Sequence, residues 1–430
     1  MIALPPLLAW ASLAAFLRDG FVSVMAVFFS AAFLYLLFFN LYHIIISFFG
    51  IVRKRERKIY TPSTRFALLV PAHNEEIVIG ETVRSMLLLD YPRELYDVIV
   101  VADNCTDRTA EVARAAGATV LERFNESERG KPYAVDWALR QILESPRDYG
   151  AVCVFDADNL VSRNYLLEMN SRILQGEKVI QGYIDAKNPN DSWITWMYAI
   201  SFWTAARSYQ LPRYQLGLAN LLGGTGYCIT TDVLKVYGWE VTALADDLEY
   251  TMRVLLDGIR PTWAHDAKVY DEKPLNMKAS WRQRLRWMQG HWDVAFRYTI
   301  PLLKRGIKTR DYRCIDGALY CLSPTRAMLW GSTLVLSWVP WIFPEVYRLT
   351  PNPGPWLGTG VVALYWGWPM VEMALERVPP IYFLRYLALM FIFSLTWIPL
   401  AWLGFLRRHL KHWDKTEHTR AISITEIERR

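Results

Sequence analysis

The apolar residues of this chain are concentrated at its two ends, and this limits what the chain can fold into. Residues 2–17 are apolar, residues 18–20 (Arg-Asp-Gly) interrupt them, and residues 21–52 form a second apolar run. The second run is long enough to cross a bilayer with some tilt. Three further candidate spans lie in the C-terminal third: 327–343, 356–375 and 381–405. We therefore expect membrane segments on both sides of a globular middle part.

Basic clusters adjoin the apolar runs at residues 53–58 and 407–412. Positive residues beside a span mark its cytoplasmic side, so we predict a multi-pass protein of the plasma (inner) membrane whose middle part is cytoplasmic. Three C-terminal crossings would place the second cluster outside. One of these runs is therefore expected to be interfacial or re-entrant instead of spanning the membrane. The first candidate is the run that contains Pro324, Arg326 and Pro340.

Charge and cysteine usage exclude other classes of protein. A formal net charge of +6 over 430 residues is too small for a nucleic-acid-binding surface. The five cysteines are scattered, with no Cys-x-x-Cys pair, and indicate reduced thiols rather than a disulfide framework.

The middle of the chain alternates short apolar runs with helical patterns. Strands are predicted at 66–71, 98–102, 118–121 and 151–155, and helices at 75–89, 107–116 and 132–143. This order predicts an α/β fold with a largely parallel sheet, whose ligands bind beyond the carboxyl ends of the strands. Further helices are predicted at 193–209, 246–256 and 281–298. The expected parts are 1–60 (membrane segments and basic flank), 61–300 (catalytic domain), 301–412 (membrane region) and 413–430 (polar cytoplasmic tail).

Asp156 and Asp158 follow a predicted buried strand. Side chains two residues apart on an extended chain point the same way, so both carboxylates can face one crevice. Their oxygens suit Mg²⁺ or Mn²⁺, which in turn bind diphosphate oxygens. The alternative is an ordinary Asp-rich turn.

Two predicted helices carry polar residues that have either a structural or a catalytic role. Asp246 and Asp247 begin one helix, where they either cap it or, because adjacent carboxylates repel, supply a proton acceptor. Gln283, Arg286 and Trp287 share one face of the other helix. That face suits a sugar and a phosphate, but it also suits a helix lying beside the bilayer.

Three further positions lie at predicted strand ends or helix starts. Lys131 precedes a helix and is either a phosphate contact or a solvated lysine. The polar cluster 70–76 follows the first strand, where it cradles a nucleoside or simply turns the chain. Asp103 lies at the carboxyl end of the second strand.

Together these residues resemble a membrane-bound family 2 glycosyltransferase, the group that includes cellulose, chitin and hyaluronan synthases. The resemblance covers about residues 65–298. Seven motifs carry it in the family's order: Val-Pro-Ala-His-Asn-Glu-Glu (70–76), Ala-Asp-Asn (102–104), Gly-Lys (130–131), Asp-x-Asp (156–158), Gly-Thr-Gly (224–226), Asp-Asp (246–247) and Gln-x-x-Arg-Trp (283–287).

The resemblance implies a GT-A fold and an inverting transfer from a nucleotide-diphosphate sugar, expected to be a UDP-sugar. It implies that Asp247 is the general base and that Asp158 is the metal ligand for Mg²⁺ or Mn²⁺. The implied donor-site residues are Pro71, Glu75, Asp103, Lys131 and Asp156. The implied diphosphate and acceptor residues are Asp246, Gln283, Arg286 and Trp287.

The chain departs from the family pattern at two places. Ala245-Asp246 stands where Thr-Glu is usual, and Ala102 stands where many members have an Asp, which weakens the nucleoside assignment for Asp103. No gating segment of the cellulose-synthase type is found.

Three functions are compatible with these patterns. The sequence favours transfer to a growing exopolysaccharide or capsule, where a second copy or an export partner would complete the translocation path. The alternative is transfer of a single sugar to a lipid acceptor. A non-catalytic membrane subunit is disfavoured because the acids and the Gln-x-x-Arg-Trp motif are intact.

Overall fold

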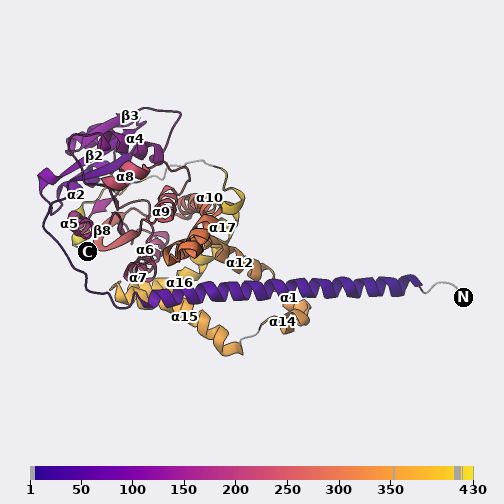
Figure 1. Ribbon diagram of the computed structural model, residues 1–430. Helices are drawn as coiled ribbons and strands as arrows, with labels where there is room; N and C mark the ends of the chain where they lie inside the picture. Colours follow the sequence, from indigo (N-terminus) through magenta and orange to yellow (C-terminus); the bar gives the residue numbers. More distant parts are fainter. Residues whose placement is uncertain (1–4, 352–353, 411–417, 419, 430) are drawn as a thin grey trace.

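A computed structural model describes residues 5–351, 354–410, 418 and 420–429, and one long helix projects from its globular part (Figure 1). Helix α1 (Pro5–Phe48) is continuous. The expected break at residues 18–20 is therefore wrong; Arg18 instead forms an ion pair of 2.7 Å with Glu345 of helix α14 (Pro344–Leu349). Residues 1–4 of the first expected segment lie outside the described part.

Within the described residues, two helical stretches are long and apolar enough to cross a membrane, Ala14–Phe48 and Ile381–Leu406. The second contains α16 (Ile381–Leu395) and α17 (Trp397–Leu406). The suspected run is divided into α12 (Pro324–Val335) and the short α13 (Val339–Ile342). The candidate 356–375 lies in α15 (Gly354–Leu375), which is not one of the two stretches.

The first four strands form the parallel half of the sheet, as predicted. They are β1 (Phe66–Ala72), β2 (Tyr96–Asp103), β3 (Thr119–Arg123) and β4 (Ala151–Val154). In the register, Phe66 of β1 lies opposite Tyr96 and Ala151. The connecting helices are α2 (Ile79–Leu87), α3 (Thr109–Ala115) and α4 (Lys131–Leu143). The carboxyl ends of β1, β2 and β4 consequently meet at one edge.

The other half of the sheet is mixed, and the sequence analysis did not predict its strands. Strand β7 (Tyr227–Thr230) runs antiparallel to β4 and to β6 (Val179–Ala186). Strand β8 (Pro261–Asp271) is parallel to β6, and β5 (Leu160–Val161) is antiparallel to β8. The strand order of the described sheet is β3-β2-β1-β4-β7-β6-β8-β5.

Helices cover both faces of the sheet because its central strands are apolar on both sides. Phe66, Leu68 and Val70 of β1 pack toward α2, α3 and α5 (Tyr165–Leu174). The alternate residues Ala67 and Leu69 pack toward α4, α8 (Thr231–Tyr237) and α9 (Asp246–Leu256). This pattern is typical of central strands that are buried on both faces.

A helical layer joins the sheet to the apolar helices. It contains α6 (Trp193–Ala205), a π-helical turn (Ala206–Gln210), α7 (Leu211–Leu216), α10 (Met277–Thr309) and α11 (Tyr312–Cys321). Asn276 caps α10 by accepting a 2.9 Å hydrogen bond from Ala279 N. Trp292 Nε1 of α10 donates to Ala401 O of α17 at 3.0 Å. Helix α10 therefore connects the globular domain with the second candidate span.

The C-terminal segment returns to the domain instead of extending as a free tail. In Figure 1 the C-terminus lies beside α5 and β8. Within the described residues of the segment, Ile424 is buried against Leu160, and Glu428 pairs with Arg163 at 3.1 Å. Residues 413–417, 419 and 430 of the predicted tail lie outside the described part.

Candidate active site

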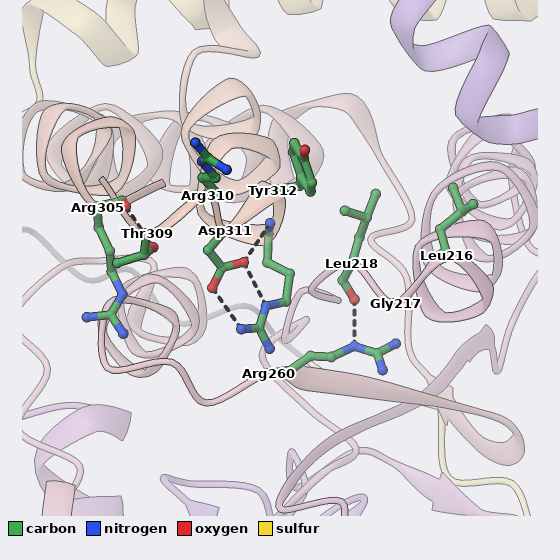
Figure 2. Close-up of a pocket in the computed structure, with 10 residues that line it drawn as sticks. Leu216, Gly217, Leu218, Arg260, Arg305, Thr309, Arg310, Asp311 and Tyr312 are labelled. Carbon is green, nitrogen blue, oxygen red and sulfur yellow. Dashed lines mark hydrogen bonds and ion pairs between the residues drawn. The ribbon is translucent and has the colours of Figure 1, made fainter. Parts of the chain in front are cut away.

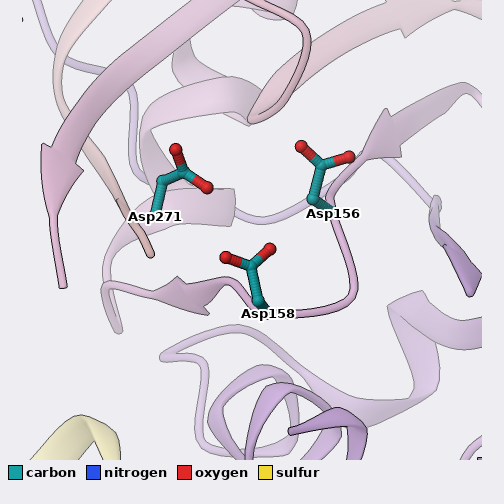
Figure 3. A group of neighbouring side chains, drawn as sticks. All are labelled: Asp156, Asp158 and Asp271. Carbon is teal, nitrogen blue, oxygen red and sulfur yellow. The ribbon is translucent and has the colours of Figure 1, made fainter. Parts of the chain in front are cut away.

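Three carboxylates meet at the carboxyl-end edge of the sheet. Asp156 and Asp158 follow β4, and Asp271 ends β8. Figure 3 shows the three side chains around a common space, and one ligand oxygen of each lies within 4.8 Å of the others. The predicted pair is thus brought together with a third acid that the sequence analysis missed. Asp271 carries no motif, and its strand was not predicted.

Asp158 and Asp271 have different surroundings, and these shift their carboxyl pKa values in opposite directions. Asp158 is only 1% exposed, and burial raises its carboxyl pKa to about 7. Asp271 is half-buried; desolvation alone would raise its carboxyl pKa, but the Lys273 ammonium at 2.6 Å keeps that pKa below the usual value. A divalent cation would favour the ionised form of Asp158. A set of carboxylate oxygens at this spacing therefore fits Mg²⁺ or Mn²⁺.

His418 of the C-terminal segment reaches the same edge. Its Nδ1 lies 3.2 Å from both carboxylate oxygens of Glu75, and its Nε2 lies 4.0 Å from Asp158 Oδ2. Burial alone would lower the pKa of the His418 imidazole, but the Asp158 and Glu75 carboxylates outweigh it and raise the pKa to about 10. The sequence analysis missed His418, because no spacing connects it with acids more than 250 residues away.

Lys131 contacts the site rather than solvent. As the first residue of α4, it forms an ion pair with Asp156 and donates to Gly224 O at 2.6 Å. Burial would lower its ammonium pKa, but Asp156, Asp246 and Asp247 together raise it. The predicted donor-site lysine therefore lies among three of the predicted site acids.

Asp246 and Asp247 form the first turn of α9, as predicted. Asp247 Oδ1 accepts a 2.8 Å hydrogen bond from Leu248 N, so the side chain does satisfy one amide at the helix start. Burial raises the carboxyl pKa of Asp247 to about 7, and the adjacent Asp246 adds to the shift. Gly224 lies beside it: a Cβ added to this residue would be 3.5 Å from Asp247 Oδ2. The two interpretations of this motif are thus compatible.

Helix α10 packs directly on the start of α9. A Cβ added to Gly290 would lie 2.7 Å from Ala245 Cβ, so only glycine allows this approach. Burial raises the carboxyl pKa of Asp246, and the positive charge of Arg286 partly offsets this rise. This effect indicates that the Arg286 guanidinium lies near the acids. Gln283 Oε1 is buried with no hydrogen-bond partner among the described residues. An orphaned buried acceptor of this kind is costly unless a ligand satisfies it.

Trp287, Asp103 and Pro71 are the remaining predicted residues. Trp287 stacks obliquely on Tyr198 of α6, with ring centroids 6.1 Å apart, and belongs to an aromatic cluster with α16. Asp103 is buried and accepts from Arg123 at 2.7 Å. Pro71 is buried within β1.

The cysteines are free thiols, as expected. Four of them are buried, and Cys105 is partly exposed.

Comparison with known proteins assigns most of the globular part to a family. The model of the family described as "Glycosyltransferase like family 2" matches residues 62–290, more than half of the chain. The chain belongs to glycosyltransferase family 2. It is therefore an enzyme of the glycosyltransferase class, and the resemblance found in the motifs is confirmed.

Relatives differ in the acceptor that their names give. The chain is 31% identical over 261 residues to the beta-monoglucosyldiacylglycerol synthase of Nostoc sp., covering 57% of this chain and 52% of that protein. It is 24% identical over 246 residues to the poly-beta-1,6-N-acetyl-D-glucosamine synthase of Staphylococcus epidermidis, covering 55% and 57%. The chain thus spans about half the length of these relatives.

The structure resembles the mannosyltransferase PcManGT of Pyrobaculum calidifontis, solved in complex with GDP-Man and Mn²⁺. The TM-score is 0.53 at 20% identity, with 83% of this chain and 96% of that chain covered. This similarity confirms the predicted α/β fold of the GT-A type.

Proposed function

We propose that this enzyme transfers one sugar from a nucleotide-diphosphate sugar, expected to be a UDP-sugar, to a lipid acceptor at the membrane surface. The observation that carries the transfer reaction is the gathering of Lys131, Asp156, Asp246 and Asp247 around the glycine-containing loop at Gly224. These residues come from different elements, and the contacts of Lys131 with Asp156 and with Gly224 O support one shared site.

The contact of α10 with the candidate span supports an acceptor that is held at the bilayer. Arg284 of α10 donates to Thr396 Oγ1 at 2.7 Å, between α16 and α17. Gln283 and Arg286 of the proposed site are only one and two residues from Arg284 along the same helix. The higher identity to a glycolipid synthase favours a lipid acceptor over the polysaccharide that the sequence analysis preferred.

A growing polysaccharide is the second candidate. The similarity to a poly-beta-1,6-N-acetyl-D-glucosamine synthase supports it, and a second copy or an export partner would then extend the path of the product. Membranes incubated with radiolabelled sugar nucleotides distinguish the two. A label extracted into organic solvent supports the lipid acceptor, whereas a label in high-molecular-weight polymer supports the polysaccharide.

We further propose that Asp156, Asp158 and Asp271 hold a divalent cation, Mg²⁺ or Mn²⁺. When bound, the cation would neutralise charge on the departing nucleoside diphosphate. Arg286 would add positive charge beside the same leaving group, and Gln283 would hydrogen-bond a hydroxyl of sugar or acceptor.

Asp247 is the proposed base. It would accept the proton of the acceptor hydroxyl as that oxygen attacks the anomeric carbon from the face opposite the leaving group, so an α-linked donor would give a β-linked product. Its raised pKa suits proton transfer near neutral pH. Asp103, Glu75 and Pro71 remain proposed donor-site positions.

The proposed organisation places residues 61–300 in the cytoplasm as the catalytic domain, between membrane regions at 1–60 and 301–412. The basic flank 53–58 supports a cytoplasmic location of this domain. Part of the flank also contacts the domain, since Arg53 pairs with Asp266 with one N–O distance of 2.7 Å.

The substitution Asp247→Asn tests the role of the base. It keeps the shape of the side chain but removes the proton acceptor, so we expect transfer to fall by about 10²–10⁴-fold while nucleotide binding survives. Turnover is measured with a radiolabelled donor, and binding by calorimetry.

Asp257→Asn is the matched control, because Asp257 is exposed at the other end of α9. It should transfer like the unmodified enzyme. Near-normal turnover of Asp247→Asn would remove Asp247 as the base.

A further inference from the structure

A basic pocket lies far from the acids, where the end of α7 meets the turn between α10 and α11 (Figure 2). Its volume is about 640 Å³, within the range of small-molecule sites. Arg260 precedes β8, whereas Asp271 ends this strand. Strand β8 contains a bulge and spans the length of the eight-residue strand β6, so it separates the pocket from the acid edge by roughly 25 Å. We propose that this pocket binds the phosphate headgroup of an anionic phospholipid.

The pocket carries a surplus of positive charge. Four arginines line it, Arg260, Arg305, Arg310 and Arg313, against the single carboxylate of Asp311 among its described lining residues. Arg313 uses that carboxylate twice, with N–O distances of 2.8 and 2.7 Å. The charges of the other three arginines are not matched by a carboxylate of the pocket.

The three remaining arginines are disposed to receive an anion. The guanidinium of Arg260 donates hydrogen bonds to the carbonyl oxygens of Leu218 and Tyr214, at 2.9 and 2.7 Å. Arg305 Nε is buried without a hydrogen-bond partner among the described residues. Arginine forks match phosphate oxygens in geometry as well as charge.

Arg310 has a backbone conformation that is unusual for an arginine. It ends α10 in the left-handed region, with φ of 55°. Glycine or asparagine is common at this position, because a side chain there is sterically disfavoured. The side chain of Arg310 is exposed and lines the pocket, so it is accessible to an anion there.

The end of α7 is tied to the end of the apolar helix α1. Gln215 Nε2 donates to the carbonyl oxygens of Phe49 and, at 3.2 Å, of Val52, and Gln215 Oε1 accepts from Lys54 N at 2.6 Å. Leu216, the next residue, lines the pocket. The pocket therefore begins where the candidate span ends.

The contacts that helices α11 to α14 make with α1 independently place the pocket near the C-terminal end of α1. Glu345 bonds Arg18, Thr325 bonds Tyr35, and Asp316 bonds Tyr42 at 2.7 Å. The earlier a residue stands in this segment, the closer its partner in α1 lies to the C-terminal end of that helix. Tyr312, which lines the pocket, precedes Asp316 by one helical turn and lies at the end of the span.

Apolar side chains surround the basic pocket on the surface. Tyr312 is 74% exposed, Leu216 is 38% exposed and Ile307, on the last turns of α10, is 71% exposed. Basic groups with neighbouring aromatic and aliphatic side chains are typical of surfaces that contact an anionic membrane. This arrangement favours a lipid headgroup over a soluble phosphate compound.

The test measures lipid binding and does not depend on transfer activity. The full chain, purified in neutral detergent, is mixed with phosphatidylglycerol or phosphatidylcholine, and the retained lipid is quantified by native mass spectrometry. We expect phosphatidylglycerol to be retained at least tenfold more than phosphatidylcholine. The double variant Arg305→Gln and Arg310→Gln should lose this difference.

The matched control removes two exposed arginines from the sheet domain, Arg108→Gln and Arg140→Gln, and should retain phosphatidylglycerol fully. The single variant Arg310→Gln, at an exposed site, serves if the double variant unfolds, and should lower retention several-fold. Equal retention of both lipids, unchanged retention in the pocket variants, or complete competition by millimolar glycerol phosphate would overturn the proposal.

Discussion

At the scale of single residues, the site is defined by carboxyl groups whose burial changes their protonation. Asp158 is buried and Asp247 is half-buried, and desolvation raises the carboxyl pKa of each to about 7. Asp271 differs because Lys273 keeps its pKa low. A buried acid with a raised pKa is expensive for the fold once it ionises, and such cost is common at catalytic positions.

The pH dependence of transfer follows from Asp247. The base works only when it is deprotonated, and its pKa is about 7 instead of the ordinary value near 4. We therefore expect kcat/KM to rise as the pH increases from 5.5 to 7 and to level off above about 8. A rate that is constant across this interval would contradict the assignment of Asp247.

At the scale of elements, the proposed catalytic geometry rests on the close approach of α9 and α10. The substitution Gly290→Ala introduces a Cβ against Ala245, just before Asp246 and Asp247. We expect it to separate the helices, to destabilise the fold by about 1–3 kcal/mol and to reduce transfer strongly. Thermal unfolding and turnover report the two effects.

The control for this prediction is Gly367→Ala, since a Cβ at this helical glycine of α15 meets nothing within 4 Å. It should leave turnover unchanged and should not lower the unfolding temperature, because alanine favours a helix more than glycine does. Full activity of Gly290→Ala would show that the contact between α9 and α10 does not position the acids.

The elements show how far sequence patterns predict this protein. The parallel strands β1 to β4 and helix α9 were predictable, because uninterrupted apolar runs and acids at a helix start are local signals. Strands β6 and β8 were not, because buried polar residues such as Gln181 and His265 interrupt their apolar pattern. Gln181 bonds Gly223 N at 2.8 Å and so shapes the glycine-containing loop, a role that only the tertiary structure shows.

The candidate site was predictable in part for the same reason. Asp156, Asp158, Asp246 and Asp247 belong to motifs that are short in sequence. Asp271 and His418 reach the site through the sheet topology and through the returning C-terminal segment, and no local spacing encodes either path.

At the scale of the whole molecule, segments that are distant in sequence are assembled around one edge of the sheet. The C-terminal segment brings His418 to Glu75 and Asp158, and Arg420 N lies 3.2 Å from the Glu272 carboxylate oxygens. Helix α10 connects that edge with the second candidate span. Two C-terminal parts of the chain thus contact the elements that carry a site built on its middle.

The central claim is that this edge forms a single pocket whose donor binding depends on a cation. Calorimetric titration of UDP and of GDP, each with Mn²⁺ and with EDTA, tests it most directly in the full chain, in Asp158→Asn and in the Asp257→Asn control. The account predicts that one nucleotide binds only with Mn²⁺ and that Asp158→Asn weakens this binding at least tenfold while the control does not. Equal affinity in EDTA, or unchanged affinity in Asp158→Asn, would contradict it.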